Sequence, residues 1–293
     1  MRIGVDAGGT FTDFVVLHDD GRLEAFKTRS NPADPASVIL AGLDRAAGRR
    51  RASVVHGSTV ATNALLERKG ARTALVTTLG FEDLVHIGRQ NRPELYNLTP
   101  LPRQPVVPRE LCFGLPERAF FDGTVEREPS TADLDKLARR LRRAKVESVA
   151  VCFLHAWRVA SNEARVKAAL SSGPWYVCCS HEISPEFREY ERASTTLVNA
   201  CVGPLMQSYL ERLRAGSRHS IVVMQSNGGS LSAAEAARQA VRTVLSGPAG
   251  GVVGAARLAA LSGCTRVLGF DMGGPSTDVS LIDGSPRETT ETT

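Results

Sequence analysis

Apolar runs near the two ends of the chain predict a pair of β-hairpins. Close to the N-terminus, Ile3-Gly4-Val5 precedes Gly8-Gly9, and a second apolar run follows at 14–17. The same order returns near the C-terminus, where Leu268-Gly269-Phe270 precedes a Gly-Gly pair at 273–274 and an apolar run at 279–282. A Gly-Gly pair between such runs is typical of a tight hairpin, because the turn needs a positive φ that glycine adopts without strain.

Between these hairpins, apolar patterns with periods of two and of 3.6 residues alternate. They predict strands over 22–27, 53–56, 74–77, 148–154, 175–179 and 221–225, and helices over 35–47, 60–68, 131–143, 162–171, 186–214 and 246–261. Ser130 is expected to cap the helix that follows it, Gly70 to end the helix over 60–68, and Pro204 to break or kink the long helix. Residues 80–128 are proline-rich and are expected to be irregular. This alternation indicates an α/β fold built on mixed sheets.

Composition narrows the class of protein. The 293 residues are 42% hydrophobic, and the net charge is +5. Arginines cluster at 49–51 and at 139–143, but no aromatic residues interleave with them, so we expect no role in binding nucleic acid. The six cysteines show no metal-binding spacing and are interpreted as reduced, while the histidines outside His56 are interpreted as structural or surface residues. Met1 leads straight into the first strand, and no apolar run approaches the roughly 20 residues that span a bilayer. We expect a soluble, cytoplasmic protein with no membrane association.

The two predicted hairpins are an internal repeat. Residues 4–13 and 269–278 share six of ten positions, which are Gly, Asp, Gly, Gly, Thr and Asp. Asp6 and Asp271 end the incoming strands, where carboxylates suit Mg²⁺ and a catalytic role in phosphoryl transfer. Backbone N–H groups of glycine turns form anion-binding concavities, and threonine hydroxyls add donors. The predicted phosphate contacts are Gly8, Gly9, Thr10, Thr12, Gly273, Gly274 and Thr277.

The repeat does not match two common phosphate-binding motifs. The spacing is neither the dinucleotide-binding fingerprint nor a Walker loop, because no helix opens after the glycines and no Gly-Lys-Ser/Thr follows. Either copy alone is explained as an ordinary hairpin, whereas the pattern that both copies share favours a binding site for a polyphosphate and its metal. Asp13 and Asp278 are interpreted as residues that pin the hairpins, with a role in ordering the metal's water as the alternative.

Further residues are candidates for binding a substrate. Ser58 and Thr59 end a strand before a helix, where N–H groups attract anions, although a hydroxyl there also serves as a helix cap. Asn63 lies one turn into that helix. Asn227 follows a strand end, the usual place for ligand loops in open sheets. Arg89 and Arg92 suit a bidentate grip on a carboxylate, with ordinary surface arginines as the alternative.

Two other segments are interpreted as structural and not as parts of a binding site. The small residues from Ser246 to Gly251 are interpreted as allowing close packing of the helix that they open, in preference to binding an anion. Glu189, Glu191 and Arg192 are interpreted as charges on the exposed face of the long helix.

The chain resembles the N-terminal part of the hydantoinase A/oxoprolinase family. The matching stretches follow in family order: Asp6–Asp13, His56–Glu67, Ile87–Gln90, Glu189–Arg192, Gln225–Gly229, Ser246–Gly251 and Asp271–Gly274. One position departs from the family motif, which has threonine where this chain has Pro275. The resemblance implies the actin-like ATPase (ribonuclease H-like) fold of sugar kinases and heat-shock chaperones. It further implies ATP-dependent opening of cyclic amides such as 5-oxoproline or hydantoins, together with a hydantoinase B-type partner subunit.

The resemblance also implies a domain organisation and a mechanism. Residues 1–262 are expected to form a first lobe with an inserted α/β region at about 80–185, and residues 263–293 the incomplete start of a second lobe. ATP with Mg²⁺ is expected to phosphorylate the lactam oxygen of the substrate. Two alternatives stay open: a small-molecule kinase or ketone carboxylase subunit of the same superfamily, and a truncated, non-catalytic lobe that binds a partner.

Overall fold

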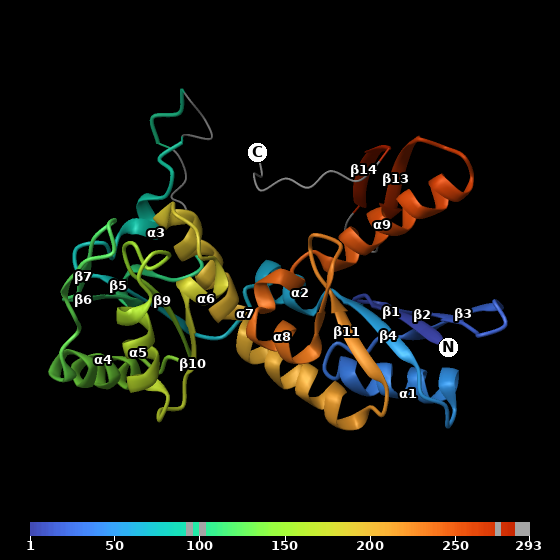
Figure 1. The fold of residues 1–293 in the computed structure, drawn as a ribbon, viewed down its shortest axis with the longest axis horizontal. Helices are drawn as coiled ribbons and strands as arrows, with labels where there is room; N and C mark the ends of the chain where they lie inside the picture. The colour runs from blue at the N-terminus through green and yellow to red at the C-terminus, as the bar shows by residue number, and fades with distance from the viewer. Residues whose placement is uncertain (92–95, 100–103, 273–276, 285–293) are drawn as a thin grey trace. The chain divides into compact units, whose positions relative to one another are not determined.

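The computed structural model describes residues 1–91, 96–99, 104–272 and 277–284, which fall into two compact units (Figure 1). Unit 1 comprises Met1–Ala64 and Met206–Thr293, and unit 2 comprises Leu65–Leu205. The chain passes from one unit to the other within α2 (Val60–Leu66) and again within α7 (Glu189–Gly216). The division into a lobe over 1–262 and the start of a second lobe stays a prediction.

Unit 1 is built on a six-stranded mixed sheet with the strand order β12-β11-β4-β1-β2-β3. The strands are β1 (Arg2–Ala7), β2 (Phe11–Leu17), β3 (Leu23–Arg29), β4 (Ser53–Ser58), β11 (Ser220–Met224) and β12 (Ser230–Ser232). β1 pairs antiparallel with β2 and parallel with β4. Along β1, Ile3, Val5 and Ala7 are buried, whereas Gly4 and Asp6 face outward. The alternation of the sequence therefore puts Asp6 on the face opposite the core.

Helices cover this sheet. α1 (Pro35–Ala47) contacts β1, β2 and β3, and the carboxylate of its cap Asp34 accepts a hydrogen bond from the Ser37 N–H group. α8 (Ala233–Arg238) and the 3₁₀ turn η2 (Ala240–Thr243) lead into α9 (Ser246–Leu261), which contacts β4 and β11. The expected bounds of α1 and α9 are confirmed.

Gly42 in α1 provides a test of this packing. A Cβ atom at Gly42 would lie 2.1 Å from Cζ of Phe14, a buried ring that stacks on Phe26. Overpacking of a core costs about 1–3 kcal/mol, whereas removing a helical glycine gains at most about 1 kcal/mol. We therefore expect Gly42→Ala to lower the unfolding free energy, as measured by urea denaturation. Gly254→Ala in α9 is the matched control, because its Cβ atom meets nothing within 4 Å and the change should stabilise the protein. Equal stability of the two variants would contradict this packing.

The second predicted hairpin is present and also lies in unit 1. β13 (Arg266–Met272) pairs antiparallel with β14 (Thr277–Asp283), and both contact α9 (Figure 1). Asp271 lies opposite Asp278, as Asp6 lies opposite Asp13. The repeat in the sequence is thus a repeat in strand register. Its turn, which contains Gly273, Gly274 and Pro275, lies outside the described residues.

Unit 2 is built on a four-stranded parallel sheet with the order β10-β9-β5-β6. Its strands are β5 (Thr73–Thr78), β6 (Cys112–Leu115), β9 (Ser148–Cys152) and β10 (Tyr176–Cys179); its helices are α3 (Leu84–Ile87), η1 (Arg109–Leu111), α4 (Thr131–Arg143), α5 (Ser161–Leu170) and α6 (Ser180–Ile183). A small hairpin joins β7 (Arg118–Ala119) to β8 (Val125–Arg127). Ser130 and Asp133 form the expected capping box at α4. The prediction that 80–128 is irregular was wrong, because β6 extends the sheet there and buries Cys112 and Phe113.

Two further predictions in unit 2 differ from the structure. Pro204 was expected to break or kink α7, and the break is absent, because the helix is continuous for 28 residues. Proline removes the N–H donor to the carbonyl of Ala200, but Ser148 Oγ donates to that carbonyl at 2.6 Å instead. The backbone N–H of Ala71 likewise donates to the carbonyl of Cys201 at 2.8 Å. Donors from other segments thus replace the helical N–H groups at these two carbonyls, and the helix continues through the proline.

Gly70 is also not a helix cap. α2 ends at Leu66, and Arg68 is the residue with a left-handed φ, of 53°. A Cβ atom at Gly70 would lie 2.1 Å from Cys201 Sγ, so glycine is needed there for close packing rather than for capping.

All six cysteines are free, and only Cys264 is exposed. None of the helices in the described part of the chain combines the length and apolarity that crossing a membrane requires.

Candidate functional site

The carboxylate of Asp6 is the centre of the candidate site. It lies at the end of β1, opposite Asp13 on β2. Its pKa is raised, first because surrounding protein removes water from the carboxylate, and then because Asp13 and Asp271 carry like charge. The residue as a whole is exposed, but protein atoms surround much of its carboxylate. The acidic residues of the two repeats are close enough to influence one another.

The first turns of α9 lie beside both aspartates. The Cβ position of Gly247 is 3.8 Å from Asp6 Oδ1, and that of Gly251 is 3.8 Å from Asp271 Oδ2. Residues four apart share one face of a helix, so one face of α9 meets both carboxylates. The positive end of a helix dipole favours negative charge, and the N-cap Leu245 supplies no side-chain hydrogen bond. The glycines that were interpreted as packing residues also adjoin the acidic site.

The backbone of the Gly8-Gly9 turn does not have the positive φ that the sequence predicted. Neither glycine has a positive φ. Glycine is instead favoured by close approach, because a Cβ atom at Gly8 would lie 3.1 Å from the Phe11 carbonyl oxygen, to which the Gly8 N–H also donates. Gly9 and Thr10 are exposed. Thr12 is buried, and its hydroxyl bonds to Ser30 Oγ at 3.0 Å on the opposite face of the sheet. The Gly8 N–H group and the Thr12 hydroxyl are therefore used within the fold.

The turn after β4 gathers three of the predicted substrate residues. The N–H and hydroxyl groups of Thr59 both donate to the carbonyl of Ala7, at 3.2 and 3.0 Å. Asn63 Nδ2 donates to Thr59 Oγ1 at 3.4 Å and lies 3.9 Å from the Cβ position of Gly9. Ser58 is buried, and its hydroxyl accepts from the Val60 N–H group at 3.2 Å. Thr59 and Asn63 therefore adjoin the first hairpin, while the Ser58 side chain points into the interior.

Two further predicted residues of unit 1, Asn227 and Thr277, are exposed. Asn227 follows β11 and uses its Oδ1 to accept from the Gly229 N–H group at 3.0 Å. Thr277 begins β14 opposite Met272.

In unit 2, Arg89 Nε bonds to Glu191 Oε1 at 2.7 Å, and Arg92 lies outside the described residues. The interpretation of Arg192 as a surface charge was wrong. Its side chain is buried and donates to the carbonyls of Phe153 and Glu186. Sequence reasoning took its helical position as a sign of exposure.

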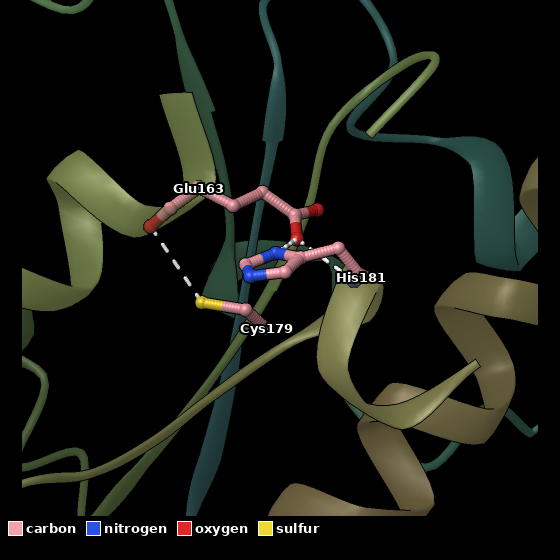
Figure 2. Close-up of side chains that lie close together, drawn as sticks. All are labelled: Glu163, Cys179 and His181. Carbon is pink, nitrogen blue, oxygen red and sulfur yellow. Dashed lines mark hydrogen bonds and ion pairs between the residues drawn. The ribbon is translucent and has the colours of Figure 1, made fainter. Parts of the chain in front are cut away.

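Sequence reasoning also missed a buried carboxylate in unit 2 (Figure 2). Glu163 on α5 is fully buried, and each carboxylate oxygen accepts two hydrogen bonds. Oε1 accepts from the Phe153 N–H group at 2.9 Å and from Ser180 Oγ at 2.6 Å. Oε2 accepts from the N–H group and Nδ1 of His181, at 3.0 and 2.6 Å. No spacing in the sequence marks this glutamate as buried.

Glu163, Cys179 and His181 lie close enough together to be considered as metal ligands (Figure 2). Both carboxylate oxygens are already saturated with donors, however. The Cys179 thiol donates to the Glu163 backbone carbonyl, and burial, followed by nearby carboxylates, raises its pKa. Metal binding requires a thiolate and free carboxylate oxygens. The arrangement is therefore that of a structural anchor, which ties the segment after β9 and the start of α6 to α5.

Comparisons with known proteins agree with this architecture. Residues 2–172 match the model of the hydantoinase/oxoprolinase N-terminal region, and residues 192–293 match the hydantoinase/oxoprolinase model. The chain is 36% identical to caprolactamase subunit alpha of Pseudomonas jessenii, over 97% of this chain and 43% of that protein. It is 34% identical to 5-oxoprolinase PfmaA of Pestalotiopsis fici, over 100% of this chain and 26% of that protein.

A nucleotide-free structure of acetone carboxylase superposes with a TM-score of 0.86 at 28% identity, covering 97% of this chain and 44% of that one. The chain thus spans less than half the length of each of these relatives. Its mixed sheets and helices have the predicted actin-like ATPase fold. The chain belongs to the hydantoinase/oxoprolinase family.

Proposed function

We propose that this chain provides nucleotide-binding residues of an ATP-dependent amidohydrolase that opens cyclic amides of the 5-oxoproline or hydantoin type. The observation that carries the proposal is the placement of Asp6 and Asp271, from two copies of one motif, along a single face of α9. The names of the caprolactamase and 5-oxoprolinase relatives support the amide as the bond that is broken.

The acidic residues fit a magnesium ion. Mg²⁺ prefers carboxylate oxygens and is usually held by one or two carboxylates together with substrate phosphates. The pKa of Asp6 is raised, first by loss of water around the carboxylate and then by the like charges of Asp13 and Asp271, and a divalent cation would relieve that repulsion. Asp6 and Asp271 would hold the ion, and Asp13 and Asp278 lie opposite them on the paired strands. When bound, Mg²⁺ would neutralise charge on the phosphates.

The phosphates would be held by donors of the two turns. Gly9 and Thr10 are the exposed members of the first turn, and Thr277 adjoins the second. Gly273 and Gly274 keep the same proposed role but lie outside the described residues. Such donors stabilise the charge of phosphoryl transfer without rearranging during the reaction.

Phosphorylation explains why ATP is required. An amide is a poor electrophile because of resonance, so transfer of the terminal phosphoryl group to its oxygen, with release of ADP, activates the ring carbon. Water then adds to this carbon and the ring C–N bond breaks, with a proton passing to the leaving nitrogen. A second water hydrolyses the acyl phosphate that results, which gives the open-chain carboxylate and inorganic phosphate. Thr59, Asn63 and Asn227 of unit 1 remain our candidates for orienting the substrate, and Arg89 of unit 2 remains a separate candidate. The proposal also includes a hydantoinase B-type partner subunit.

A second function shares the phosphorylation step. The likeness to acetone carboxylase favours activation of a ketone oxygen in place of an amide oxygen. ADP release measured with 5-oxoproline, a hydantoin and a simple ketone separates the two functions. A partner-binding, non-catalytic role would show neither ADP release nor nucleotide binding.

Asp6→Asn tests the site itself. We expect saturating Mg-ATP to protect the wild-type protein against thermal unfolding, by about 2.7 kcal/mol at a hundredfold excess over Kd. Asp6→Asn should abolish this protection, because it removes a metal-binding charge. It should not destabilise the unliganded protein, because it also removes the cost of holding a charge that is partly shielded from water and repelled by Asp13 and Asp271.

Asp283→Asn, at the exposed end of β14, is the matched control and should retain protection. If Asp6→Asn were protected as well as the wild type, Asp6 would not belong to a nucleotide site.

A further inference from the structure

We propose that His56, Tyr209 and Ser58 form a buried hydrogen-bond relay that positions the turn Ser58–Val60, which adjoins the proposed nucleotide site. This inference rests on the proposed function for its consequence in binding. The three side chains come from β4, from α7 and from the end of β4, and all belong to unit 1. Each is about 1% exposed, so water does not compete for their hydrogen bonds.

The histidine fixes the direction of the relay. His56 Nδ1 lies 3.4 Å from the carbonyl oxygen of Val5, and Nε2 lies 2.6 Å from the Tyr209 hydroxyl. A carbonyl only accepts, so Nδ1 carries the proton. Nε2 of the neutral ring is then the acceptor, and the Tyr209 hydroxyl donates to it.

The relay continues into the turn. The Ser58 hydroxyl interacts with that of Tyr209, and since the Tyr209 proton is directed at His56, the relay runs from Ser58 to the Tyr209 oxygen. Ser58 Oγ in turn accepts from the N–H group of Val60, the first residue of α2. The relay therefore runs in one direction, from the Val60 N–H group in α2 to the Val5 carbonyl in β1, and each donor in it has one acceptor. Removing the Tyr209 hydroxyl would interrupt the relay at its middle and leave two buried groups without their partner.

The turn that the relay holds is joined to both parts of the acidic site. Thr59, between Ser58 and Val60, donates twice to the carbonyl of Ala7, the residue after Asp6. Ser246, the first residue of α9, is fully buried, and its hydroxyl donates to the carbonyl of Ser58 at 3.3 Å. A shift of this turn therefore moves the Asp6 strand relative to the start of α9. Tyr209 is a positioning residue that acts through Ser58.

Tyr209→Phe tests the relay against a matched variant. Tyr176→Phe in unit 2 also removes a hydroxyl from a largely buried tyrosine, one that accepts from Asn199 Nδ2 at 3.3 Å. We expect both variants to unfold at lower temperature. Only Tyr209→Phe should raise the Kd for Mg-ATP, by about tenfold, as a lost buried hydrogen bond implies. It should also accelerate amide exchange at Val60 and Asn63, measured without nucleotide.

The outcomes separate the relay from the proposed function. No binding of Mg-ATP by the wild-type protein would overturn the proposed function, while faster exchange in Tyr209→Phe would still support the relay. Unchanged exchange at Val60 together with wild-type affinity in Tyr209→Phe would overturn the relay. Equal losses of affinity in both tyrosine variants would also overturn it, because the effect would then follow general stability. If Tyr209→Phe does not fold, Ser58→Ala gives the same readouts and leaves the pair of His56 and Tyr209 intact.

Discussion

Glu163→Gln is expected to lower the unfolding free energy of unit 2 by about 3–5 kcal/mol, the usual cost of breaking a buried charged network. The wild-type carboxylate accepts four hydrogen bonds away from water. Glutamine has one accepting oxygen, and its NH₂ group would face donors. At least one of the N–H groups of Phe153 and His181 would be left buried without an acceptor, which costs about 1–3 kcal/mol by itself.

Urea denaturation followed by tryptophan fluorescence measures this loss directly. Both tryptophans of the chain, Trp157 and Trp175, lie in unit 2 and so report on its unfolding. Glu182→Gln is the control on the same segment as His181. Glu182 bonds to Lys167 at 2.7 Å, but both side chains are about 40% exposed, so the change should cost less than about 1 kcal/mol. Comparable losses in the two variants would show that Glu163 is not an anchor.

Acid is expected to destabilise unit 1 through His56. Burial lowers the pKa of this histidine from 6.5 to about 4. Above pH 6.5 the ring is neutral in both the folded and the unfolded chain, and its contribution to stability is complete. As the pH falls from 6.5 to 4, the unfolded chain takes up a proton that the folded chain does not, so stability decreases. At about 1.4 kcal/mol per pKa unit, the total loss is about 3 kcal/mol.

The comparison with His56→Asn isolates this contribution, because all other titrating groups are shared. At pH 7 the variant should be less stable than the wild type, because it lacks the hydrogen bond between the His56 ring and the Tyr209 hydroxyl. The difference should shrink as the pH falls toward 4. Circular dichroism is the suitable probe, since unit 1 holds no tryptophan. A difference in stability that stays constant between pH 7 and 4 would mean that His56 titrates normally in the folded protein.

Much of the local structure was predictable because its causes lie within a few residues. The alternation of Ile3, Val5 and Ala7 with outward residues specified both β1 and the face that carries Asp6. The cap at Ser130 needed only Asp133, three residues away, and the bounds of α1 followed from Pro35 and its apolar face. The repeat identified Asp6 and Asp271 as equivalent positions, since strand, turn and register are all encoded locally.

The tertiary structure decided which polar groups are buried and which partners they have. Glu163 and Arg192 have the helical positions of surface charges, yet both are buried, because their partners arrive from other segments of the chain. Pro204 leaves α7 intact because Ser148, 56 residues earlier, bonds to the freed carbonyl.

The same holds for the candidate site. The sequence by itself determined the two hairpins and their acidic residues, whereas the folded chain placed α9 beside both carboxylates and brought Tyr209 to His56, which is 153 residues away along the chain. A local pattern records which face of an element is apolar. The hydrogen bonds that make a buried charge or a proline tolerable come from elements that only folding brings together.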